Sequence, residues 1–82
     1  MADAEIDKVL DCRGMQCPMP VVRTAKEMAG LTPGQLLELR ATDRGAISDI
    51  PAWAEDTGNE LVSSTDEDGE LTFVLRKGEG AD

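Results

Sequence analysis

The chain has 82 residues and a net charge of −9, with 8 basic side chains, 17 acidic side chains and no histidine. This length allows one small domain with a thin core, and because phosphate attraction needs clustered Lys and Arg, we expect no direct nucleic-acid binding. No apolar run approaches the roughly 20 residues that a membrane span requires, and the acidic segment 1–7 does not resemble a secretory signal, so we expect a cytoplasmic protein with no membrane contact.

The first half of the chain predicts a strand, a helix and a second strand. Residues 8–12 (KVLDC) form the first predicted strand. From Pro18 the apolar residues recur with a helical period as far as Gly30, which ends the helix. Residues 35–42 (QLLELRAT) alternate in part and predict the second strand. The expected inward face of the helix comprises Val21, Val22, Ala25, Met28 and Ala29.

The second half predicts another helix and a hairpin. Residues 46–58 form the helix, and Ser48 or Asp49 is placed to cap its start. Residues 60–64 and 70–76 form two more strands, joined by a loop whose Asp-Gly pair favours a tight turn. The expected inward face of this helix comprises Ile47, Ile50, Trp53 and Ala54.

The order of these elements is β-α-β-α-β-β. It predicts an α/β (α+β) two-layer sandwich, in which a mixed four-stranded sheet carries both helices on one face. We expect residues 8–78 to form this single domain, with flexible termini at 1–7 and 79–82. We expect the isolated domain to be monomeric.

The stretch CRGMQCPMP holds both cysteines and is the leading candidate for a site. If the first helix begins at Pro18, then Cys17 is its N-cap, and Pro20 occupies the third helical position. A thiol there feels the positive end of the helix dipole, and such cysteines can have a strongly lowered pKa. Arg13 and Arg23 are near enough in sequence to add positive potential. We therefore expect Cys17 to be a thiolate nucleophile; the alternative is a buried cysteine that only packs.

The remaining composition leaves this nucleophile without a catalytic base. Without histidine there is no Cys-His pair, and two cysteines cannot fill a four-ligand zinc site within one chain. We expect no metal and no cofactor. A nucleophile without a base suits a carrier that one partner loads and another unloads. Cys12 is either a small packing residue at a strand end or a second thiol that forms a disulfide with Cys17 in a redox switch.

A longer pattern surrounds the two cysteines. Its first part is Leu10-Asp11-x-x-Gly14-x-x-Cys17-Pro18-x-Pro20. Its later parts are Asp43, Asp49-Ile50-Pro51, Glu60-Leu61-Val62 and Arg76-Lys77-Gly78. With these residues the chain resembles the TusA/SirA/YedF family of small sulfur carriers. The resemblance extends over residues 8–78, which is nearly the whole domain.

The resemblance implies the same βαβαββ sandwich and an activity. It implies a sulfurtransferase that accepts sulfane sulfur as a persulfide on Cys17 and relays it to an acceptor protein. The implied donor is a cysteine desulfurase or a rhodanese-like protein, and the implied acceptor is a DsrE-like or other relay protein. The pathway would be tRNA thiolation, sulfur oxidation or general sulfur trafficking. The supporting residues that it implies are Pro18, Pro20, Asp11, Gly14 and Asp49.

The charge distribution supports a non-enzymatic alternative. Residues 8–44 carry six basic and four acidic side chains, whereas residues 45–82 carry two basic and ten acidic side chains. A regulatory or adaptor module would use this acidic face to bind a basic partner protein. Such binding would survive the loss of the Cys17 thiol, whereas sulfur carriage would not.

Overall fold

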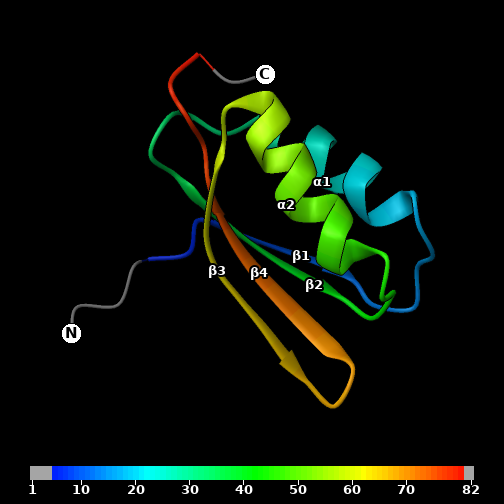
Figure 1. Cartoon of the computed structure of the whole chain (residues 1–82). Coiled ribbons are helices and arrows are strands. Elements are labelled where there is room, and N and C mark those ends of the chain that lie inside the picture. The colour runs from blue at the N-terminus through cyan, green and yellow to red at the C-terminus, as the bar shows by residue number, and fades with distance from the viewer. Residues whose placement is uncertain (1–4, 81–82) are drawn as a thin grey trace.

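The computed structural model describes residues 5–80 and confirms the expected fold class (Figure 1). A mixed four-stranded sheet forms one layer and two helices form the other. The elements are β1 (Lys8–Cys12), α1 (Met19–Ala29), β2 (Leu36–Ala41), α2 (Ala46–Thr57), β3 (Glu60–Glu67) and β4 (Glu70–Arg76). The outer parts of the tails that we expected to be flexible, residues 1–4 and 81–82, lie outside the described residues.

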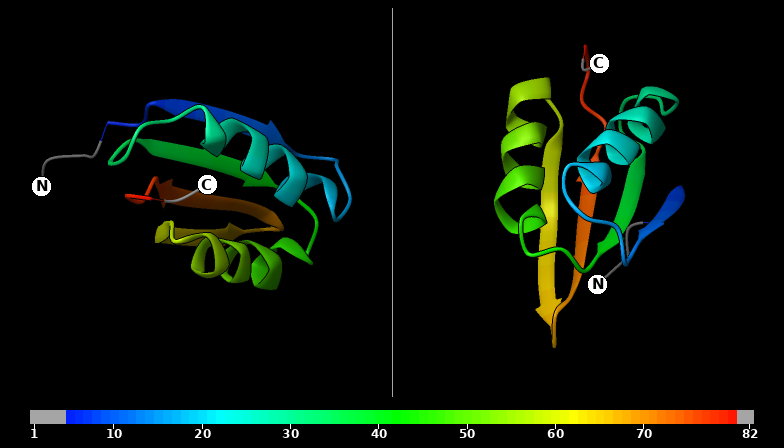
Figure 2. Two further views of the ribbon diagram at one scale, coloured as in Figure 1. Left: turned by 90° about the horizontal axis from the view of Figure 1, so that it is seen from above. Right: turned by 90° about the vertical axis from the view of Figure 1, so that its right-hand side faces the viewer.

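The sheet has the strand order β1-β2-β4-β3. β1 and β2 are parallel, whereas β4 is antiparallel to both of its neighbours. Both helices lie on the same face, α1 across β1 and β2, and α2 across β3 and β4 (Figure 2). Because β1 and β2 are parallel neighbours, the loops that follow them and lead into the two helices meet at one end of the sheet.

The core lies between the sheet and the helices. Leu10 of β1 is paired with Leu39 of β2, which is paired in turn with Phe73 of β4. All three side chains point to the helices and are at most 5% exposed. The opposite face of the sheet is polar, with ion pairs such as Arg40–Glu38 at 2.9 Å. Burial of the aliphatic face is therefore the main contribution to the stability of the fold.

The buried face of α1 differs from the predicted one. Its buried residues are Pro20, Thr24 and Met28, which follow one another at a spacing of four. Val22 is 50% exposed and Ala29 is exposed, so the prediction that they face inward was wrong. The reason is that α1 packs along the outer strand pair and also contacts α2. Only a narrow stripe meets the sheet, and a threonine, which a hydrophobic pattern counts as polar, stands at its centre.

Helix α2 follows its prediction more closely. Ile50 and Ala54 are buried as expected, together with Ala46, and Trp53 is half-buried against the core. Ile47 is 42% exposed, so its predicted inward position was wrong. The pocket beside Ile47 explains the difference, because β3 and β4 leave this first turn partly uncovered. The other residues lining that pocket are Ser64, Thr65, Asp66, Leu71 and Phe73.

The C-terminal hairpin is longer than predicted. β3 continues to Glu67 instead of ending at Ser64. Asp68 and Gly69 form the turn with positive φ values of 55° and 86°, which is the type I′ pattern that an Asp-Gly pair favours. The tip of the hairpin projects beyond the helices (Figures 1 and 2). Neither helix within residues 5–80 has the length and apolar character needed to cross a membrane.

Candidate functional site

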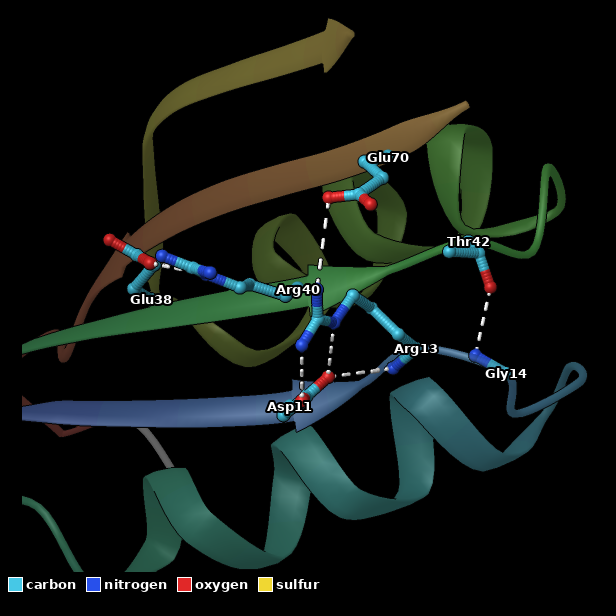
Figure 3. Close-up of polar contacts among 7 residues, drawn as sticks. All are labelled: Asp11, Arg13, Gly14, Glu38, Arg40, Thr42 and Glu70. Carbon is cyan, nitrogen blue, oxygen red and sulfur yellow. Dashed lines mark hydrogen bonds and ion pairs between the residues drawn. The ribbon is translucent and has the colours of Figure 1, made fainter. Parts of the chain in front are cut away.

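The loop between β1 and α1 carries Cys17 and is fixed to the neighbouring strand. Gly14 has a φ of 84°, a conformation that favours glycine. Its N–H donates a hydrogen bond of 2.9 Å to the hydroxyl of Thr42, just beyond β2 (Figure 3). The N–H of Met15 donates to the carbonyl of Cys12 at 3.1 Å. The loop therefore turns tightly and brings Cys17 to the end of the sheet where both helices begin.

Helix α1 begins one residue later than predicted. Its first residue is Met19, Pro18 is the N-cap and Pro20 is the second helical residue. The carbonyl of Pro18 accepts the first hydrogen bond of the helix, from the N–H of Val22 at 3.0 Å. Cys17 therefore precedes the N-cap, and its assignment as the N-cap was wrong. Two prolines at these positions remove two N–H groups from the start of the helix.

The thiol of Cys17 contacts the other helix. Its Sγ–H donates a hydrogen bond of 2.5 Å to Oδ2 of Asp49, in the first turn of α2. Neither Asp49 nor Ser48 caps α2, because Gly45 is the N-cap. A Cβ atom placed on Gly45 would lie 3.5 Å from Sγ of Cys17. The site thus joins the beginnings of α1 and α2, and the thiol itself is exposed.

This contact reverses the predicted ionisation of Cys17. The hydrogen bond to Asp49, partial desolvation and the negative charges of Asp49 and Asp43 raise the pKa of Cys17 from its ordinary value of 9.0 to about 11. The expectation of a lowered pKa was therefore wrong. The helix dipole does not lower this pKa, because the proline-containing helix start presents few N–H groups. A carboxylate in direct contact with the thiol outweighs the remaining positive potential of the helix start.

The two arginines expected to lower the pKa of Cys17 act elsewhere. Arg13 forms two side-chain hydrogen bonds of 3.0 Å with the carboxylate of Asp11, and it lies 3.8 Å from Glu70 (Figure 3). The side-chain and backbone hydrogen bonds from Arg13 lower the pKa of Asp11 to about 2. Arg23 lowers the pKa of Cys12, although burial of that thiol has the larger, opposite effect. Neither arginine contributes to the pKa shift of Cys17.

Cys12 occupies a different environment. Its side chain is fully buried in the core cluster, beside Ala41 of β2, and burial raises its pKa. Both cysteines are free thiols. This burial favours the interpretation of Cys12 as a packing residue at the end of β1 over that of a disulfide partner. Across residues 5–80 no group of three or more His, Cys, Asp or Glu side chains is arranged to hold a metal ion.

Two members of the site were assigned no role from the sequence. Asp43 accepts a hydrogen bond of 3.1 Å from the N–H of Gly45 and adds negative charge near Cys17. Gly45 provides the close approach of the second loop to the thiol. A usable signal was present, because the loops after two parallel neighbouring strands share one edge of the sheet. That rule alone brings residues 43–49 close to Cys17.

Comparison with known proteins identifies the family. The family described as sulfurtransferase TusA matches residues 8–77. The YrkI protein of Bacillus subtilis (strain 168) is 51% identical over 72 residues, which cover 88% of this chain and 96% of that protein. The sulfur carrier protein TusA of Allochromatium vinosum is 40% identical over 74 residues, covering 90% of this chain and 97% of that protein.

A solved structure supports the fold independently. The crystal structure of a SirA-like protein from Desulfitobacterium hafniense superposes with a TM-score of 0.77 at 23% identity. The match covers 87% of this chain and 97% of that chain. It shows the shared two-layer architecture. The family match and the relatives above show that the chain belongs to the TusA family of sulfur carrier proteins.

Proposed function

We propose that this protein is a sulfurtransferase that carries sulfane sulfur as a persulfide on Cys17. The observation that supports the proposal most strongly is the contrast between the two thiols. Cys17 is exposed at the start of both helices, whereas Cys12 is buried in the core. A carrier needs a thiol that two different proteins can reach, and Cys17 is the cysteine that meets this condition.

The transfer requires neither an oxidant nor a cofactor. The sulfur of Cys17, once deprotonated, attacks the terminal sulfur of a persulfide on the donor. The sulfur–sulfur bond of the donor breaks as a new one forms on Cys17, and the donor departs as a thiolate that recovers one proton. Sulfane sulfur passes from the donor to Cys17 without net oxidation. An acceptor thiol unloads Cys17 by the same exchange, in the manner of thiol–disulfide chemistry.

The surroundings of Cys17 suit protein partners. Gly45 has no side chain beside the thiol, which leaves that approach open. Met19 is 44% exposed in the first turn of α1, and Ile47 is 42% exposed in the first turn of α2. Apolar side chains on both sides of a reactive group provide contact surface for a partner. We propose a cysteine desulfurase or a rhodanese-like protein as donor, and a DsrE-like or other relay protein as acceptor.

The test is the intact mass of the protein after exposure to a low-molecular-weight persulfide such as glutathione persulfide. Wild type, Cys17→Ser and Cys12→Ala are compared, with alanine chosen because position 12 is apolar and buried. We expect wild type and Cys12→Ala to gain one sulfur atom that a reductant removes. We expect no such gain in Cys17→Ser.

Two results would overturn the proposal. Normal sulfur uptake by Cys17→Ser would show that another atom holds the sulfur. Absence of uptake by folded wild type, both from the small persulfide and from a persulfide-loaded desulfurase, would favour the adaptor alternative. Partner binding through the acidic residues 45–82 would then be tested by its dependence on salt.

A further inference from the structure

We infer that Asp49 is a catalytic residue of this carrier, the base that removes the proton from Cys17 as sulfur is loaded. The inference rests on the proposed function and assigns the proton, which that function leaves unassigned. It replaces the expectation, drawn from the absence of histidine, that Cys17 has no catalytic base. Its physical basis is the direct hydrogen bond between the thiol and Oδ2 of Asp49. General bases act across contacts of this kind, in which the acceptor already touches the proton that it will take.

The charges around Cys17 provide no other route to a reactive thiolate. The groups that act on its ionisation are Asp49 of α2 and Asp43 of the loop after β2, and both are negative. Arg13 is engaged by Asp11 and Glu70, and Arg44 by Asp66 at 2.9 Å. Arg23 acts on Cys12 and not on Cys17. A free thiolate would therefore be scarce at neutral pH. A thiol that reacts here needs its proton removed during the attack.

The fold holds the carboxylate of Asp49 in place for this step. Asp49 is half-buried in the first turn of α2, and its N–H donates to the carbonyl of Gly45 at 3.0 Å. No ion pair of the described residues engages its carboxylate, so the thiol of Cys17 does not compete with a cation for it. The positive end of the α2 dipole favours a carboxylate at this position. Asp43 differs, because its Oδ2 accepts from the backbone N–H of Gly45.

The loading step balances in atoms and electrons. The proton of Cys17 moves to Oδ2 of Asp49 while Sγ bonds to the terminal sulfur of the donor persulfide. The electron pair of the broken sulfur–sulfur bond leaves with the donor cysteine. The protonated Asp49 returns the proton to that departing thiolate, and its carboxylate is regenerated. The donor persulfide is the oxidised partner before the step, and the Cys17 persulfide is the oxidised partner after it.

The pH dependence of loading distinguishes a general base from a carboxylate that takes no part in the proton transfer. A thiol paired with its own base does not have to ionise before it reacts, so the protein's contribution to the loading rate varies little between pH 6 and pH 9. Without the base only free thiolate reacts, and its population rises about tenfold for each pH unit below the thiol pKa. The experiment measures single-turnover loading of the full chain by glutathione persulfide across this range. Ionisation of the donor affects every variant equally, so the ratio of variant to wild type at each pH isolates the contribution of the protein.

The informative variants are Asp49→Asn, Asp43→Asn and Asp49→Glu. We expect Asp49→Asn to load about 100-fold more slowly than wild type at pH 6, within the range of general-base effects, and to approach wild type near pH 9. Asp43→Asn removes the same charge from a neighbour that accepts a hydrogen bond from Gly45 and not from the thiol, and we expect its ratio to wild type to stay nearly constant with pH. Asp49→Glu returns a carboxylate, and we expect it to restore the shallow profile at a reduced rate.

Other outcomes would overturn the inference while leaving the proposed function intact. If Asp49 only suppresses the thiolate, Asp49→Asn will load faster than wild type near neutral pH, because the pKa of Cys17 falls from about 11 towards its ordinary value of 9.0, although desolvation and Asp43 still raise it. The ratio of variant to wild type will then stay nearly constant with pH below pH 9, instead of rising with pH. Should Asp49→Asn fail to fold, Asp43→Asn decides the question, because this variant will load faster than wild type if only free thiolate reacts. Failure of the proposed function is a separate result, normal loading of Cys17→Ser.

Discussion

The two helices begin at one end of the molecule and finish at the other (Figure 1), and polar groups are treated differently at these ends. Where the helices finish, Lys77 is only 7% exposed, and its ammonium group donates to the carbonyl of Met28 in the last turn of α1 at 3.0 Å. Asn59, equally buried, donates to the hydroxyl of Thr57 and accepts from the N–H of Gly78. This end is closed, and its polar groups are paired within the protein.

Where the helices begin, the polar groups are not paired in this way. Pro18 and Pro20 remove N–H groups, Cys17 is exposed, and its one hydrogen-bond acceptor is a carboxylate on the other helix. The groups that stabilise the fold and the reactive thiol therefore lie at opposite ends of the helix axes. Changes at the closed end should alter the free energy of unfolding but not sulfur loading, whereas changes to the carboxylate that contacts Cys17 should alter sulfur loading.

The largest effect is expected for Gly78→Ala. A Cβ atom on Gly78 would lie 1.9 Å from the carbonyl oxygen of Gly58, which is backbone and cannot rotate away. We expect the free energy of unfolding to fall by about 3 kcal/mol, the upper part of the usual range for overpacking. Urea denaturation measures this change, and the variant that remains folded should load sulfur on Cys17 at the wild-type rate.

Gly30→Ala is the matched control for that substitution. It adds the same methyl group at the end of α1, where the new Cβ would lie 3.6 Å from the nearest atom, an ordinary contact. We expect a change of no more than about 0.5 kcal/mol. If Gly78→Ala proved as stable as Gly30→Ala, the close approach of the two backbones would not be what holds this end shut.

Much of this architecture could be read from local signals. Gly30 ends α1, the Asp68-Gly69 pair forms the hairpin turn, and alternation along β4 identifies its buried face. Such signals extend over a few residues and can be identified directly in the sequence. The contact between Cys17 and Asp49 spans 32 positions, and no local signal encodes it. The pKa of Cys17 was predicted with the wrong sign for this reason, since the helix dipole is a local property and the carboxylate is not.

A smaller effect, of opposite sign, is expected for Thr24→Val. The hydroxyl of Thr24 lies on the buried face of α1 and has no hydrogen-bond partner among the described residues. Valine has nearly the same shape and no polar group to desolvate. We expect the free energy of unfolding to rise by about 1 kcal/mol, the lower end of the cost of an unpaired buried group. Thermal or urea denaturation measures the gain.

Thr57→Val is the same substitution at the closed end and serves as its control. The hydroxyl of Thr57 donates to the carbonyl of Trp53 at 2.8 Å and accepts from the amide of Asn59 at 2.8 Å. We expect a loss of about 1 to 2 kcal/mol, because the substitution leaves the Asn59 amide without its partner. A gain in both variants would contradict the claim that the closed end depends on paired polar groups.

The smallest effect is expected from Asp11→Asn, and it is visible mainly as a dependence on pH. Arg13 holds the pKa of Asp11 at about 2 in the folded protein, below its ordinary value of 3.8. A lowered pKa in the folded state stabilises the fold above pH 4, and this contribution disappears as the pH falls through 2. We therefore expect wild type to melt slightly above Asp11→Asn at neutral pH. The difference in Tm should shrink between pH 4 and pH 2, and it should also shrink at high salt because the pair is exposed.

The same variant tests whether the open end is isolated from nearby cations. Asp11→Asn weakens the hold on Arg13, which still lies beside Glu70 on the polar face of the sheet (Figure 3). If that face keeps the guanidinium away from Cys17, the pH profile of sulfur loading will match that of wild type. A shift of the profile to lower pH would mean that Asp11 restrains a cation that can reach the thiol. The acidic environment of Cys17 would then depend on both faces of the sheet and not on Asp43 and Asp49 alone.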